Sequence, residues 1–176
     1  MENACDIQLR ETLYKNFSNL QDMIKFAEAK NTAIIASAGA IITLVFDKLC
    51  FSGLLQKIFS LGYFFIVVSL FIAFWSFVPI THPNKLKKKN NNTKNEACKN
   101  LFLFTDIASF TNFAEFESDI IKTYYDGQKL SKLERDVLQQ VYTNANIACR
   151  KFSIFRQALY FFLIGATLIA VFGPFK

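Results

Sequence analysis

The chain has 176 residues, of which 52% are hydrophobic and 21 are phenylalanine, and its formal net charge is +6. This composition is too apolar for an ordinary soluble domain of this size. The single histidine, His82, excludes a histidine-based metal site or catalytic triad, and the four cysteines have no CxxC spacing. Because no glycine-rich phosphate loop occurs either, we expect no enzyme, no metal site and no cofactor.

The first thirty residues predict an amphipathic helix with a narrow apolar seam. Hydrophobic residues recur at alternating spacings of four and three, at Leu13, Phe17, Leu20, Ile24 and Ala27. A seam of this width suits packing on one other helix rather than on a broad core. No glycine or proline separates the seam from the apolar run that follows, so one long helix is expected to continue into that run.

Three uncharged apolar runs, residues 31–46, 58–82 and 157–175, predict three transmembrane helices. A bilayer core about 30 Å thick needs about 20 apolar residues in a helix, and the second and third runs reach that length. For the shorter first run, a buried helix of a soluble protein is the alternative. This run also carries small residues that permit close helix contact, either within the chain or between chains: Ala33, Ala36, Ser37, Gly39 and Ala40.

Lysine and arginine around these runs predict the orientation. Six lysines lie between residues 85 and 99, whereas only Lys48 and Lys57 separate the first two runs. Three spans place the N-terminus and the loop 82–156 on the same side, and both are basic. The positive-inside rule therefore places them in the cytoplasm and Lys176 outside. The basic stretch can contact anionic lipid headgroups, and binding to nucleic acid is not expected.

The loop before the third run holds the remaining soluble structure. Residues 112–125 predict a helix capped by Asn112, and Asp126-Gly127 ends it. Ser131 and Glu134 fit a capping box for a second helix. Its apolar positions continue at helical spacing into the third span, at Leu133, Val137, Val141, Ala145, Ala148 and Phe152.

The expected fold class is therefore an all-α membrane protein, with three transmembrane helices and a small helical cytosolic portion built from extensions of helices 1 and 3. The expected segments are a cytosolic amphipathic helix (1–30), transmembrane helix 1 with a short external loop (31–55), transmembrane helix 2 (56–81), a basic linker with a cytosolic helical sensor region (82–156), and transmembrane helix 3 (157–176).

Two stretches of sequence resemble a known family. Residues 27–41, AEAKNTAIIASAGAI, contain an acidic-x-Lys motif that enters the first span, with Glu28 and Lys30 at the matching positions. Residues 100–110, NLFLFTDIASF, and residues 139–159, QQVYTNANIACRKFSIFRQAL, resemble that family's loop motif and its last helix. The family is the transmembrane effectors of Pycsar, the bacterial pyrimidine-cyclase antiphage systems. The further matching positions are Phe104, Asp106, Ile107, Asn144, Ala145, Ile147, Ala148, Lys151 and Phe152. The chain departs from the family pattern at Asn31, where members more often have a small residue.

The resemblance implies a receptor and executor in one multi-pass chain of the bacterial inner membrane. In this family a partner cyclase makes cyclic CMP or cyclic UMP on phage infection, the cytosolic part senses it, and the membrane part impairs the membrane. The lipid bilayer and further copies of the chain are then its other expected partners. Two other readings remain open, a membrane-anchored adaptor that recruits a protein partner and a holin-like pore that needs no ligand.

Six residues are candidates for contacting a cyclic nucleotide, which offers one phosphate charge, a base edge and a face that can stack. They supply positive charge, hydrogen-bonding groups and aromatic surface: Asn144, Lys151, Tyr124, Tyr125, Glu28 and Lys30. For each a structural role is the alternative. Lys151 can extend to lipid headgroups, Asn144 can tie helices together, and Glu28 and Lys30 can pair with charges of another helix.

Overall fold

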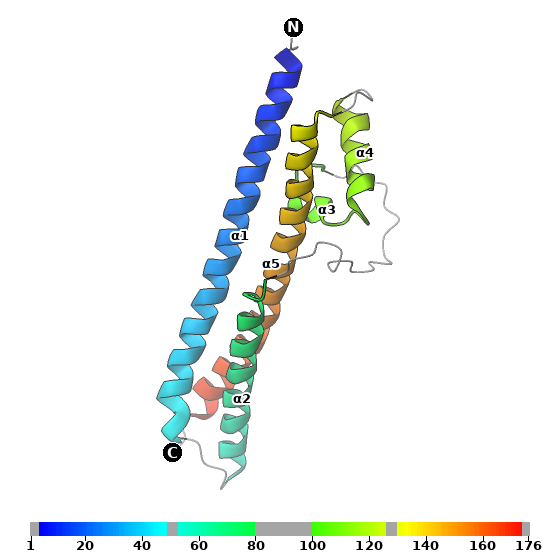
Figure 1. Cartoon of the computed structure of the whole chain (residues 1–176). Coiled ribbons are helices and arrows are strands. Elements are labelled where there is room, and N and C mark those ends of the chain that lie inside the picture. Colours follow the sequence, from blue (N-terminus) through cyan, green and yellow to red (C-terminus); the bar gives the residue numbers. More distant parts are fainter. Residues whose placement is uncertain (1–3, 49–52, 80–99, 126–129, 174–176) are drawn as a thin grey trace. The chain divides into compact units, whose positions relative to one another are not determined.

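The computed structural model describes residues 4–48, 53–79, 100–125 and 130–173. Helix accounts for 87% of these residues, and no strand occurs among them, which confirms the all-α class. The elements in chain order are α1 (Ala4–Val45), the 3₁₀ turn η1 (Phe46–Lys48), α2 (Leu54–Trp75), α3 (Phe104–Ile107), α4 (Phe113–Tyr124) and α5 (Lys132–Phe172) (Figure 1). The basic stretch 82–99, with His82, and the expected stop at Asp126-Gly127 lie outside the described residues.

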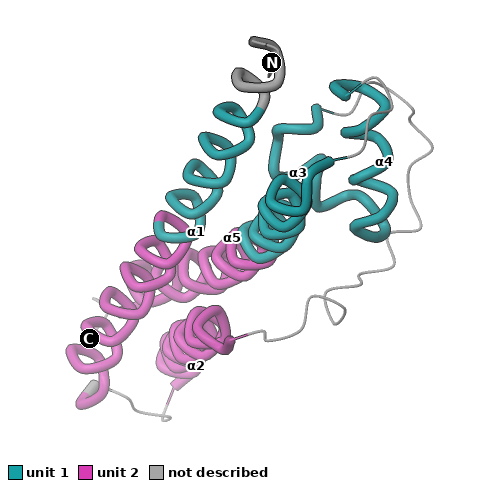
Figure 2. Tube along the Cα trace, turned by 45° about the horizontal axis from the view of Figure 1, so that its top comes forward, with its two compact units in different colours: residues 1–25, 80–149 teal, residues 26–79, 150–176 magenta. Residues whose placement is uncertain are grey.

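The chain divides into two compact units, which are coloured separately in Figure 2. Unit 1 comprises residues 1–25 and 80–149, and unit 2 comprises residues 26–79 and 150–176. Both α1 and α5 contribute residues to each unit. Each is a single uninterrupted helix, as the sequence predicts. We describe each unit by itself.

The core of unit 1 is built from one face of each of its helices. The buried side chains of α1 are Leu13 and Leu20, and Phe17 packs partly buried beside them. The apolar seam expected for the N-terminal helix is thus confirmed at these positions. The seam also contains Asn16, which is 8% exposed and which the apolar pattern did not include. From the other elements, the core contains Leu101, Ile107, Phe110, Phe116, Ile120, Leu138, Val141 and Ala145.

The starts of α4 and α5 follow the capping predictions. The Asn112 side chain accepts a hydrogen bond from the Glu115 backbone N–H at 2.9 Å. At α5, the Glu134 N–H donates to Ser131 Oγ and the Ser131 N–H donates to Glu134 Oε2, which completes a capping box. Of the apolar positions predicted for this helix, Val141 and Ala145 are buried, whereas the side chain of Leu133 is 64% exposed.

The α2 helix of unit 2 buries one narrow face against α5. The buried positions recur every three or four residues, at Phe59, Gly62, Ile66, Ser69 and Ala73. The closest contact joins two glycines: a Cβ on Gly165 would lie 2.8 Å from the Gly62 carbonyl oxygen. Further along the same interface, beyond Gly62 on α2, Ser69 Oγ donates to the Ala158 carbonyl at 2.8 Å.

Two helices, α2 and α5, are long and apolar enough to cross a membrane. They correspond to the second and third expected spans. The first span, residues 31–46, lies in α1, which is not among the candidate helices, and it stays a prediction. Its uncharged run is shorter than the roughly 20 residues that a bilayer core requires. Its small residues are not packed against the rest of unit 2, because Ala33, Ala36, Ser37 and Ala40 are exposed and a Cβ on Gly39 would meet no atom within 4 Å.

Candidate functional site

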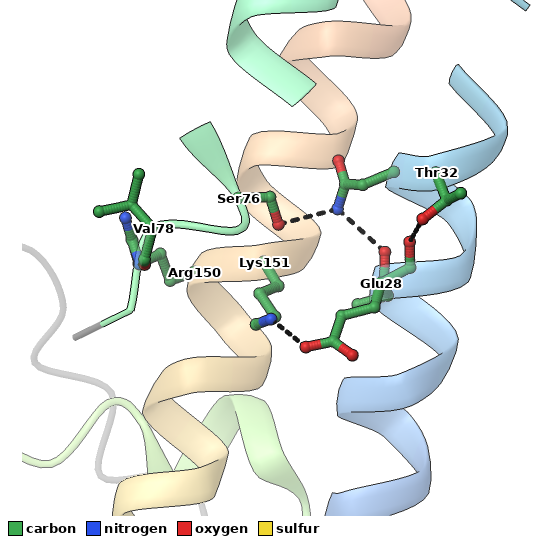
Figure 3. Close-up of polar contacts among 8 residues, drawn as sticks. Glu28, Thr32, Ser76, Val78, Arg150 and Lys151 are labelled. Carbon is green, nitrogen blue, oxygen red and sulfur yellow. Dashed lines mark hydrogen bonds and ion pairs between the residues drawn. The ribbon is translucent and has the colours of Figure 1, made fainter. Parts of the chain in front are cut away.

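Three of the six candidate residues lie together in unit 2. The ammonium group of Lys151, on α5, donates to Oε1 of Glu28, on α1 (Figure 3). The Lys151 side chain is only 12% exposed, whereas that of Glu28 is 42% exposed. The Lys151 ammonium also lies 6.0 Å from the centroid of the Phe77 ring. The positive charge of Lys151 is thus largely removed from water, and the Glu28 carboxylate compensates it.

Lys30 lies close to Glu28 on α1, and aromatic rings surround its ammonium group. Its ammonium is 4.3 Å from the centroid of Phe26, 5.2 Å from that of Phe155 and 5.7 Å from that of Phe152. A cation within about 6 Å of a ring face is attracted by the ring quadrupole. Two of these rings belong to α5, so this contact also joins α1 to α5.

Asn31 connects α1 to the end of α2. Its side chain is fully buried, and Nδ2 donates to the Ala27 carbonyl at 2.9 Å and to Ser76 Oγ at 3.1 Å. Ser76 is itself buried, and Figure 3 shows it beside the Lys151–Glu28 pair. Sequence reasoning missed this hydrogen bond, although the departure from the family pattern at Asn31 marked the position. We call Glu28, Lys30, Asn31, Ser76 and Lys151 the unit 2 clamp.

The fourth candidate, Asn144, lines a groove in unit 1. The groove has a volume of about 580 Å³ and is open to solvent along one side. Its walls come from α1 and α5 and consist of four amide side chains, one carboxylate, one hydroxyl and one aromatic ring: Gln21, Gln139, Gln140, Asn144, Asp136, Thr143 and Phe17. The volume lies in the range of ligand sites, and the lining is more polar than the mostly apolar walls that such sites usually have.

Tyr124 and Tyr125 are not among the residues that line this groove. The Tyr124 ring is 40% exposed and contacts the Phe102 ring, at 5.4 Å between centroids. Tyr125 packs, partly buried, against the core of unit 1. Tyr124 therefore contacts Phe102 and Tyr125 packs on the core, and neither lines the groove with Asn144.

The model of the Pycsar effector protein domain matches residues 12–175. The chain belongs to the Pycsar effector family. No curated protein and no solved structure matches it. The match extends over both units, so it includes the clamp and the groove together. Membership indicates an antiphage effector role in a Pycsar system, and with the two apolar helices it indicates a membrane protein.

The loop motif of this Pycsar effector, residues 100–110, builds the core of unit 1. The Asp106 carboxylate accepts from the Asn100 N–H at 3.0 Å, and Ile107 is fully buried. The Tyr142 hydroxyl donates to the Phe110 carbonyl at 3.2 Å. Burial raises the pKa of Tyr142 above its ordinary value. These contacts hold the loop in place, which explains the motif without a ligand.

Two further polar groups of the effector are engaged in structural contacts. The thiol of Cys149 points to the Phe104 carbonyl, 3.7 Å away, and burial raises the pKa of this thiol. Arg10 and Glu134 form an ion pair at 2.7 Å that joins α1 to the start of α5. Over residues 4–48, 53–79, 100–125 and 130–173, no group of three or more histidine, cysteine or acidic side chains is placed to hold a metal ion.

Proposed function

We propose that this Pycsar effector senses a cyclic pyrimidine nucleotide, cyclic CMP or cyclic UMP, made by its partner cyclase, and then impairs the bacterial inner membrane. The observation that carries the proposal is the family match over residues 12–175. The effector acts as a receptor and executor without a chemical step of its own. Stopping phage propagation then depends on membrane damage in the infected cell.

The course of α1 and α5 supports coupling between sensing and membrane damage. Each helix supplies residues to unit 1 and to unit 2, without an intervening loop. A ligand that changes the packing of either helix in unit 1 thereby acts on a helix that is also part of unit 2. All of α2, and α5 from residue 150 onward, belong to unit 2, so this unit contains the two apolar segments that can cross a membrane.

The polar contacts of unit 2 support a membrane part that is sealed before the ligand binds. The Ser69 hydroxyl, fully buried, is bonded to the Ala158 carbonyl rather than facing a water path. Ion routes usually contain charged side chains within the membrane. Within α2 the only charged residue is Lys57, in its first turn.

We propose the topology that the positive-inside rule gives, with residues 1–30 and 82–156 cytoplasmic and residues 31–46, 58–82 and 157–175 crossing the membrane. Single cysteines introduced as Asp47→Cys and Lys132→Cys in a cysteine-free chain test this. Both positions are exposed. A membrane-impermeant maleimide applied to spheroplasts should label position 47 and leave position 132 unmodified. The opposite pattern contradicts the orientation.

The six candidate residues divide into two groups on this proposal. Asn144 lines the groove of unit 1, and Tyr124 and Tyr125 pack elsewhere in that unit. Glu28, Lys30 and Lys151 belong to the unit 2 clamp. Ligand contact by any of the six stays a prediction, and self-assembly of the chain in the bilayer is proposed with it.

The function is tested with the full chain purified in detergent. Thermal unfolding is measured with cyclic CMP, cyclic UMP and cyclic AMP at matched concentrations. A ligand at 100 times its dissociation constant stabilises the folded state by about 2.7 kcal/mol, so one pyrimidine nucleotide should raise the melting temperature and cyclic AMP should not. Equal responses to all three, or none, contradict the sensing. A membrane adaptor or a ligand-independent pore would give no response.

A further inference from the structure

The groove of unit 1 contains hydrogen-bonding groups that have no partner among the residues that the structure describes. The amides of Gln21, Gln139, Gln140 and Asn144 make no hydrogen bond to another described residue, and neither does the Asp136 carboxylate. Thr143 is the exception, because its hydroxyl donates to the Gln139 carbonyl at 2.9 Å. These side chains, which the other described residues leave unbonded, are available to an external ligand.

The two helices present these groups in a regular order. Asp136, Gln140 and Asn144 are four residues apart along α5, so they lie along one face of that helix. At 1.5 Å per residue, Asp136 and Asn144 are separated by about 12 Å along the helix axis. Phe17 and Gln21 are likewise four residues apart on α1 and form the facing wall.

We infer that this groove binds the base of the cyclic nucleotide, and that Asp136 makes the effector prefer cyclic CMP to cyclic UMP. The inference rests on the proposed function and adds to it the place of the site and the identity of the base. Phe17 supplies a face on which the base stacks. The amides and Asp136 supply hydrogen bonds to the edge of the base.

Phe17 is suited to this role because its ring is half-buried. One part of the side chain packs against the core of unit 1, and another part lines the groove. A ring held by the core can stack with a base without first losing rotamer freedom. Bases in single-stranded nucleic acids are recognised in the same way, by stacking on aromatic side chains and by hydrogen bonds to their edges.

The preference for cytosine follows from hydrogen-bond polarity. Cytosine carries an amino group at C4, which donates, whereas uracil carries a carbonyl oxygen there, which accepts. An ionised carboxylate accepts only, so Asp136 pairs with the cytosine amino group and is repelled by the uracil oxygen. Amides both donate and accept, so Gln140 and Asn144 can bind the edge atoms that the two bases share.

The charge distribution sets the direction in which the nucleotide lies. The cyclic phosphate carries one negative charge, which Asp136 repels. With the base edge at Asp136, the phosphate lies toward Asn144, where the lining residues Gln140 and Asn144 are uncharged amides.

The test measures dissociation constants of the detergent-purified full chain for cyclic CMP and cyclic UMP by microscale thermophoresis. The wild type should bind cyclic CMP at least about tenfold more tightly. Asp136→Asn replaces an acceptor by a group that also donates, so it should weaken cyclic CMP, strengthen cyclic UMP and abolish the preference. The matched control is Asp22→Asn, which removes a carboxylate that is exposed, lies outside the groove lining and pairs only with Lys25 among the residues described. It should leave both constants unchanged.

Phe17→Leu and Asn144→Ala complete the test of the location. Each should weaken both nucleotides by about tenfold, because stacking and shared edge contacts do not depend on the base. Melting temperatures without ligand verify that each variant is folded. If a cyclic pyrimidine binds the wild type but these variants and Asp136→Asn bind it as the wild type does, the groove is not the site and the proposed function stands. A wild type that prefers cyclic UMP refutes the role of Asp136, and one that binds neither nucleotide refutes the proposed function as well.

Discussion

The contact between Gly62 and Gly165 predicts a sharp difference between two glycine-to-alanine substitutions. A Cβ on Gly165 would lie 2.8 Å from the Gly62 carbonyl oxygen and 2.9 Å from Ile66 Cγ1. The oxygen belongs to the α2 backbone, so it cannot move aside unless the two helices separate. At Gly39 of α1, in contrast, a Cβ would meet no atom within 4 Å.

Both substitutions gain the same intrinsic helix propensity, about 1 kcal/mol, so their difference isolates the overlap at the helix contact. Overpacking costs about 1–3 kcal/mol. Gly165→Ala should therefore destabilise unit 2 by up to about 2 kcal/mol net, while Gly39→Ala should be neutral or stabilising by up to about 1 kcal/mol. The assay is thermal unfolding in detergent, in which 1 kcal/mol corresponds to a shift of roughly 2–4 °C for a chain of this size. Equal melting temperatures for the two variants would refute the close approach of α2 and α5.

Three further predictions concern the ion pairs and the helix continuity. Glu28→Gln should be more destabilising than Lys151→Met, by about 1 kcal/mol in melting experiments. Glu28→Gln leaves the 12%-exposed Lys151 without its carboxylate, whereas Lys151→Met leaves only the 42%-exposed Glu28 without its ammonium. The reverse order contradicts this. Burial raises the pKa of Glu134, but hydrogen bonds from Ser131 and Arg10 outweigh it and hold that pKa below its ordinary 4.5. The ionised carboxylate therefore stabilises the fold above this pH, and the stabilisation is lost as the pH falls below it. Glu134→Gln should thus lower the melting temperature at pH 7, and this deficit should shrink as the pH is lowered and the wild-type carboxylate is protonated. A deficit that persists unchanged at low pH would exclude the ionic role. Two glycines inserted after Phe152 cost about 1 kcal/mol each and rotate the rest of α5 by about 200°. Nucleotide binding should therefore persist, while nucleotide-triggered depolarisation of cells should disappear. Unchanged depolarisation would show that the continuity of α5 is not needed.

Local patterns predicted the helices well, because capping and periodicity are properties of neighbouring residues. The cap at Asn112, the capping box at Ser131 and the uninterrupted courses of α1 and α5 were all accessible from the sequence. The short helix α3 was not, because its four residues are held by tertiary contacts of Ile107 and by the hydrogen bonds of Asp106 rather than by a periodic face.

Partners between distant helices were less accessible. Leu133, the first residue of the apolar pattern, is exposed, whereas the adjacent Glu134 is buried and forms an ion pair with Arg10. Nothing in the local sequence indicates that a charged residue takes the inner position. Glu28 and Lys30 were named as possible partners of charges on another helix. The structure pairs Glu28 with Lys151, whereas the Lys30 ammonium lies over the Phe26 ring.

The small residues also show that contacts between helices are hard to predict from local sequence. The small-residue face of α1, which includes Ala33 and Gly39, was expected to permit close contact either within the chain or between chains. Within the chain, the close approach lies between two isolated glycines, Gly62 and Gly165, whereas Ala33 and Ala40 of α1 are exposed, so a contact of this face between chains stays a prediction. A small residue permits close contact, but which helix approaches it depends on the packing of both surfaces.

The unit 2 clamp limits how the effector can respond to its ligand. A ligand shifts a conformational equilibrium only by the difference between its affinities for the two states, and moving from 1:99 to 99:1 requires about 5.5 kcal/mol. A single base contact, worth about 1–3 kcal/mol, does not reach that value. Stacking on Phe17 and the edge contacts of Asp136 and Asn144 would together have to favour the active state. A response that separates α1 from α5 in unit 2 must also break the Lys151–Glu28 pair and the contacts of Lys30 with Phe152 and Phe155. The free energy of those contacts, less that of any contacts formed in the active state, therefore adds to the differential affinity that the ligand must supply. A groove that offers several independent contacts along two helices is the kind of site that can supply it.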